Sequence, residues 1–88
     1  MPRTKPFSAD EARRIGTVLG VDWGKVDLEQ FRMGLLVELE HGTTDPETNV
    51  TDDDQGRTGK IALAHLKEVP DYYSRLATME AEARKAIK

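Results

Sequence analysis

Cysteine is absent from this 88-residue chain, and its absence excludes three kinds of chemistry. The protein can have no disulfide framework, no thiolate metal site and no cysteine nucleophile. Proteins of reducing compartments commonly lack disulfides, so we expect a cytoplasmic location.

The chain also lacks a long apolar run. No stretch approaches the length that a membrane-spanning helix needs. The basic start, Met1 to Pro6, is not followed by the apolar segment of a signal peptide. We therefore expect no membrane partner.

Charge of one sign dominates in only one place. The net charge is −3, and the segment between Thr43 and Thr58 contains five acidic residues but only one basic residue, Arg57. An acidic loop repels the phosphates of nucleic acid, and the mixture of aromatic and basic residues typical of RNA-binding sheets is missing. We therefore expect no nucleic-acid partner.

The acidic loop could also be interpreted as a calcium site. Asp45, Glu47 and Asn49 have the 1, 3, 5 spacing of an EF-hand loop. Position six is Val50, where glycine is needed, and position twelve is Gly56, where a bidentate glutamate is needed. A solvated loop rich in turn-forming residues is the favoured interpretation.

Helix start and stop signals divide the chain into four segments. Ser8 with Glu11, and Asp27 with Gln30, have the spacing of capping boxes, and Gly20, Gly42 and Pro70 provide stops. The signals predict helices over Ser8–Leu19, Leu28–Glu40, Asp54–Glu68 and Asp71–Ile87.

The predicted fold is a small all-α four-helix domain with a central antiparallel helix pair. One domain covers 1–88, with an N-terminal arm at 1–7, the acidic loop at 43–53 and a charged C-terminal tail at 80–88. The predicted core consists of Ile15, Leu19, Trp23, Phe31, Leu35, Leu39, Ile61, Leu66, Leu76 and Met79.

Two pairs of residues could carry chemistry. Glu38 and His41 are three apart on one predicted helix, and His65 and Glu68 are three apart on the next. Side chains at this spacing share a helix face, so an antiparallel pair of helices would bring all four together. Imidazole and carboxylate groups suit one divalent zinc, manganese or iron ion, and helical bundles build metal sites at this spacing.

A purely structural polar cluster is the favoured alternative. His41 lies near a helix C-terminus, where an imidazole interacts well with the helix dipole. His65 can be a core residue bonded to Tyr72 or to a carbonyl group. Tyr72 and Tyr73 diverge by about 100° on a helix, so one should be core and the other exposed or a hydrogen-bond donor.

Three stretches resemble an uncharacterised family of small bacterial and phage domains. They are Phe7–Ala12, Phe31–Gly34 with Val37–Gly42, and above all Lys60–Glu68 continued by Pro70–Tyr73 and Arg75–Leu76. In relatives the loop between the histidines is often shorter, and Asp often stands where this chain has Ala64, which removes one potential ligand. The resemblance implies the helical fold and occurrence alone or beside other modules, including in phage genomes. It implies no activity.

The sequence thus leaves two classes of function open. We expect a non-catalytic binding or assembly module with a protein partner or a second copy, located in the cytoplasm or in a phage particle as a structural or accessory protein. The alternative is a small metalloenzyme that uses Glu38, His41, His65 and Glu68 with an open metal position for water.

Overall fold

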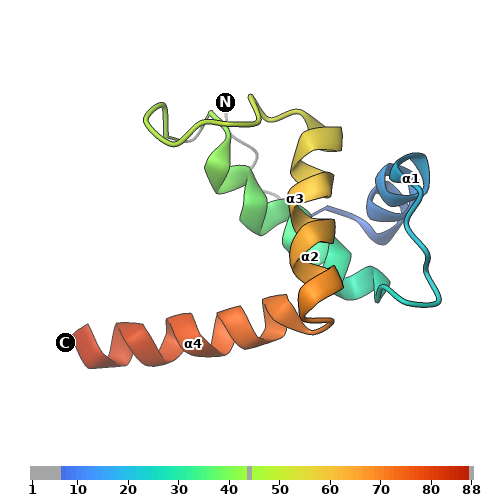
Figure 1. Ribbon diagram of the computed structural model, residues 1–88. Coiled ribbons are helices and arrows are strands. Elements are labelled where there is room, and N and C mark those ends of the chain that lie inside the picture. The colour runs from blue at the N-terminus through green and yellow to red at the C-terminus, as the bar shows by residue number, and fades with distance from the viewer. Residues whose placement is uncertain (1–6, 44, 88) are drawn as a thin grey trace.

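The computed structural model describes residues 7–43 and 45–87 and consists of helices joined by turns and loops (Figure 1). Within these residues there is no strand, so the predicted all-α fold is confirmed. The elements are α1 (Ala9–Leu19), α2 (Leu28–Glu38), the short 3-10 helix η1 (Leu39–His41), α3 (Gln55–Glu68) and α4 (Tyr72–Ile87). No helix in the described part of the chain is long and apolar enough to cross a membrane.

The predicted helix starts are confirmed to within one residue. Ser8 and Glu11 form a complete capping box, with the Ser8 hydroxyl accepting from the Glu11 amide and the Glu11 carboxylate accepting from the Ser8 amide. Each side chain thereby satisfies a backbone donor that the first turn leaves free. Gly20 ends α1 at φ 82°, a left-handed conformation that glycine adopts without strain.

Only one of the two hydrogen bonds of the second predicted capping box is present. Asp27 accepts from the Gln30 amide, but the Gln30 side chain bonds to α4 instead. Helix α2 ends at Glu38, two residues before the predicted end, because the chain tightens into the 3-10 turn η1.

Helices α2 and α3 cross at the centre of the molecule, and α1 packs on both (Figure 1). The antiparallel alignment of the central pair stays a prediction. Four buried residues of α2 recur at the spacing of one helix face: Phe31, Gly34, Leu35 and Glu38. Facing them, α3 buries Thr58, Gly59, Ala62 and Leu66. The last residue of this α2 stripe is therefore a carboxylate held inside the core.

The predicted core is partly correct. Five members are buried: Ile15, Phe31, Leu35, Leu39 and Leu66. Four are half-buried around them: Leu19, Trp23, Ile61 and Leu76. The prediction for Met79 was wrong, because α4 leaves the body within its second turn, after Leu76, and Met79 is 54% exposed.

The buried hydrophobic residues outside the predicted core list are Phe7, Ala12, Val21, Val26, Ala62 and Tyr73. Phe7 ends the segment predicted as an N-terminal arm, and residues 1–6 lie outside the described residues. The carbonyl group of Phe7 accepts from the Arg32 guanidinium at 2.9 Å. The chain just before α1 is thus anchored to α2.

Candidate functional site

Glu38 is the centre of the candidate site. It lies on the last turn of α2, on the face that packs against α3, and is only 3% exposed. A carboxylate in such a place needs partners, because burial without them costs several kcal/mol, on the order of the stability of a small domain. Three side chains from three other elements provide them.

The two oxygens of Glu38 have different partners. His41 of η1 places Nε2 3.4 Å from Oε1, and His65 of α3 places Nε2 3.5 Å from Oε2. Tyr73 of α4 donates its hydroxyl proton to Oε2 at 2.7 Å. Because α3, η1 and α4 all reach the same carboxylate, the site ties the end of α2 to each of them.

Tyr73 is the most deeply buried of these partners, at 1% exposure. Burial and the bond to the Glu38 carboxylate raise the pKa of its phenol far above the ordinary value of 10.0. The phenol therefore stays protonated and acts as a hydrogen-bond donor.

Gly34 makes room for the Tyr73 ring. A Cβ atom at Gly34 would stand 2.5 Å from Cε2 of Tyr73 and 3.0 Å from Cβ of Ala62. Both distances are shorter than packed carbon atoms allow. The missing side chain on α2 therefore lets Tyr73 reach Glu38, one turn further along the same helix face.

His65 is positioned by aromatic contacts. Its ring stacks on Tyr72 with a centroid separation of 4.3 Å and an angle of 4° between the planes. Tyr73 meets the His65 ring edge-on at 6.2 Å. The two tyrosines were predicted to diverge, and they do: Tyr73 is in the core, while Tyr72 is half-buried and covers the histidine.

Gln30 fixes the start of α4 from a distance. Its side-chain oxygen accepts from the amides of Tyr73 (3.1 Å) and Ser74 (3.3 Å), and its amide nitrogen donates to the Ser74 hydroxyl at 2.6 Å. These amides belong to the first turn of α4, where a helix has no internal acceptors. Thus α2 caps α4, in addition to binding Tyr73.

The acidic loop is joined to the site through the backbone of His41. The carbonyl group of His41 accepts from the amides of Val50 (2.6 Å) and Thr51 (3.3 Å). Asp53 closes the loop by accepting from both the amide and the hydroxyl of Thr43. These bonds hold the pKa of Asp53 below its ordinary value.

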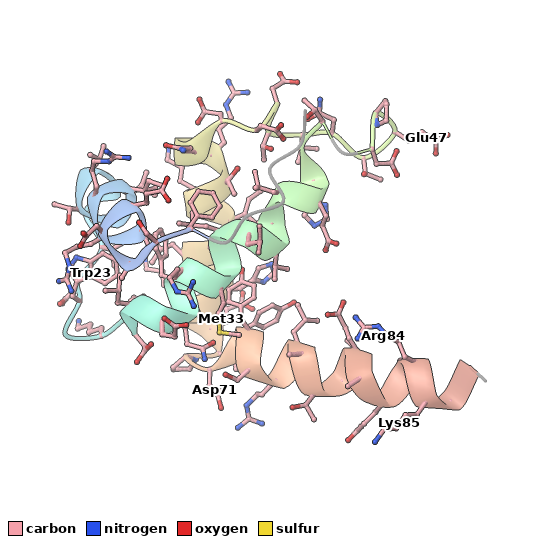
Figure 2. All side chains as sticks on the ribbon, turned by 180° about the vertical axis from the view of Figure 1, so that it is seen from behind. Trp23, Met33, Glu47, Asp71, Arg84 and Lys85 are labelled. Atoms are coloured by element: carbon pink, nitrogen blue, oxygen red, sulfur yellow. The ribbon has the colours of Figure 1, made fainter. Side chains whose placement is uncertain are left out.

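Two of the three residues considered for a calcium site, Asp45 and Asn49, are bonded within the loop. Asp45 accepts from the Glu47 amide at 3.0 Å, and Asn49 exchanges two bonds with Asp52. Glu47 points outward at the far end of the loop (Figure 2). The arrangement is that of a loop held by its own side chains.

Three of the four predicted site residues come together. Glu38, His41 and His65 meet, whereas the side chain of Glu68 is exposed and, among the described residues, makes no hydrogen bond or ion pair. From the spacing of a helix, Glu68 lies about 60° beyond His65, on the side away from Ala62 and Leu66. Within the described residues, no group of three or more His, Cys, Asp or Glu side chains is arranged to hold a metal ion.

The sequence indicated that a tyrosine could join the cluster. It did not indicate that Gln30 and Gly34 would help to position that tyrosine. The role of Gln30 carried no signal, because its spacing from Asp27 already suggested a local capping box. Gly34 did carry one: a glycine within an apolar helix face indicates that another group approaches closely there.

No curated protein and no solved structure matches the chain. A family model does match, over residues 12–82, which include the whole Glu38 cluster and most of α4. The chain belongs to the family described as "Protein of unknown function (DUF5661)".

Proposed function

We propose that the protein is a non-catalytic binding or assembly module that presents α4 to a protein partner. The observation that carries the proposal is the unequal attachment of α4. Its first turn is capped by Gln30 and bonded to Glu38 through Tyr73, whereas every described side chain from Ala77 to Ala86 is exposed.

The Glu38 cluster supports a structural role. Tyr73 donates a hydrogen bond to Oε2 of Glu38, and Nε2 of His41 lies 3.4 Å from Oε1. Within the described residues no buried side-chain nitrogen or oxygen lacks a partner. A catalytic carboxylate needs an oxygen available to a substrate or to water. In this proposal, Glu38 sets the direction in which α4 leaves the body.

A second protein surface would stabilise the exposed part of α4. An isolated helical segment of about ten residues gains little stability in water by itself. A helix that projects from a folded body is held in shape at its base, so less ordering is needed when it binds. The partner is a second copy or another protein, in a bacterial complex or a phage particle.

The test uses the full chain and a variant with charge placed on the exposed part of α4, Met79→Arg with Ala83→Arg. Sedimentation velocity measures self-association, and affinity isolation of tagged chain from its host measures association with other proteins. We expect the variant to lose the association while keeping the melting temperature. Association that is equal for both proteins would contradict the proposal.

The metalloenzyme alternative is tested with the same material. Elemental analysis of the purified chain is followed by melting curves with EDTA and with zinc, manganese or iron. A ligand that binds only the folded state raises the melting temperature. A rise that His41→Ala and His65→Ala abolish, together with metal-dependent turnover, would replace the proposed function by the enzymatic one.

A further inference from the structure

A groove lies between the connection from α1 to α2 and the second half of α3. Its volume is about 520 Å³, within the range of cavities that accept ligands or groups of side chains. Its walls are partly apolar and partly polar, and the apolar side chains include Leu19, Val21, Val26, Leu63 and Leu66.

The charged residues of the groove are mainly basic. Lys25 and Lys67 line it and are exposed. Asp22 also lines it, but its carboxylate already accepts from the Gly24 amide at 2.9 Å. A fitting partner therefore inserts apolar side chains and places carboxylates beside them.

The exposed part of α4 has this composition. From about 100° per residue, Met79, Ala83 and Ala86 lie along one stripe of the helix. Glu80 and Glu82 border the stripe, one on each edge. The stripe continues the face on which Leu76 packs against the body, and nothing in the described chain covers it.

The basic residues of this segment are elsewhere on the helix. Arg84 and Lys85 lie further round than the two glutamates, and Figure 2 shows them pointing in different directions from the far part of α4. Arg75, one turn before Met79, is already paired with Asp71. The charges that border the stripe within the exposed part of α4 are therefore acidic, which complements Lys25 and Lys67 of the groove.

The two surfaces cannot meet within one molecule. In Figure 1 the connection from α1 to α2 lies on one side of α3, and α4 runs away toward the other side. Contact between them requires two molecules.

We propose that the exposed part of α4 docks into the Lys25–Lys67 groove of a second copy. This inference rests on the proposed function and names the partner. Two different surfaces then meet, so the contact is heterologous. It gives a reciprocal pair, a ring or an extending chain, depending on the rotation between copies. Ion pairs at its rim make it weaker at high salt.

The test is a pair of charge-reversed full-length variants. The groove variant carries Lys25→Glu with Lys67→Glu, and the tail variant carries Glu80→Lys with Glu82→Lys. Sedimentation velocity at low and high salt compares each variant alone, the two mixed, and wild type. A control variant, Arg57→Glu with Lys60→Glu, makes the same charge change on the first half of α3, outside the groove.

We expect wild type and the control to self-associate, and each reversed variant to associate at least about tenfold more weakly, a loss of about 1.4 kcal/mol. Mixing the two reversed variants should restore association, because acidic groove then meets basic tail. A groove variant that associates like wild type overturns the inference, and so does a wild type that stays monomeric.

The two proposals can fail separately. If α4 substitutions abolish association with another protein while wild type stays monomeric, the proposed function stands and self-docking is wrong. If the Met79 and Ala83 variant loses no association of any kind, both fail together.

Discussion

The two ends of α4 belong to one continuous helix but are held in different ways. At Tyr72 and Tyr73 the helix is fixed by a long-range cap, a buried hydrogen bond and an aromatic stack. From Ala77 to Ala86, all side chains are exposed. The contrast teaches that helical periodicity alone does not locate a core: the apolar stripe through Leu76 and Met79 is equally regular on both sides of the point where the body ends.

The strongest way to sharpen this contrast is to truncate an apolar side chain in each region. Phe31→Ala removes a fully buried ring that packs against Trp23 at 5.7 Å and should lower the free energy of unfolding by about 3–5 kcal/mol. Met79→Ala should change it by less than about 0.5 kcal/mol. Urea denaturation measures both. A large loss at Met79 would mean that the chain itself covers the end of α4.

Removing the Tyr73 hydroxyl tests the attachment directly. Tyr73→Phe keeps the ring and deletes the bond to Glu38, so the free energy of unfolding should fall by about 1.5–3 kcal/mol. Tyr72→Phe is the matched control, because that ring stacks on His65 and its hydroxyl makes no bond with the described residues. Equal losses in the two variants would show that the phenol of Tyr73 is not specially bound.

Wild type and Tyr73→Phe should also differ in how their stability depends on pH in the alkaline range. The raised pKa of Tyr73 means that the folded state holds the phenolic proton more tightly than the unfolded state. Its stabilisation is fully present below the ordinary value of 10.0 and is lost as the pH rises above it. Between about pH 9 and about pH 11, wild type should therefore lose stability more steeply than Tyr73→Phe.

Adding one methyl group tests the space that Gly34 leaves. Gly34→Ala places a carbon 2.5 Å from the Tyr73 ring and should cost about 1–3 kcal/mol, because the ring or α2 must move. Gly56→Ala is the control: there the nearest atom is the exposed Asp54 carboxylate at 3.2 Å. A Gly34→Ala variant as stable as wild type would mean that the Tyr73 ring does not need the space that Gly34 leaves.

The smallest expected effect concerns the acidic loop. The lowered pKa of Asp53 adds stability that is present above its ordinary value of 3.8 and is lost as the pH falls below it. Asp53→Asn tolerates the same left-handed backbone, φ 61°, and should flatten this acid dependence. Glu47→Gln, at the exposed end of the loop, should leave it unchanged. Chemical denaturation between about pH 2 and pH 5 compares them.

Local signals predicted the local features of the fold. The Ser8 capping box, the Asp27 cap, the Gly20 stop and the Pro70 boundary each depend on residues close in sequence, and all four helices begin within one residue of their predicted starts. The meeting of Glu38, His41 and His65 was also predictable, because two i, i+3 pairs on neighbouring helices restrict where their side chains can lie.

The remaining features depend on how the helices are arranged in space. The exposure of Glu68 follows from the rotation of α3 about its axis, and that of Met79 follows from the direction of α4. Neither rotation nor direction is encoded by spacing along a single helix. The bonds from Gln30 to α4 likewise cross more than 40 residues of sequence.

The long-range attachment of α4 also has a consequence for the order of folding. The bond between Tyr73 and Glu38 spans 35 residues, and the bond between Gln30 and Ser74 spans 44. Contacts this distant require closure of a large loop, so we expect them to form after the local turns. During synthesis α4 leaves the ribosome after α1, α2 and α3. We therefore expect Glu38 to lack one of its partners until α4 has been synthesised and Tyr73 can donate to it.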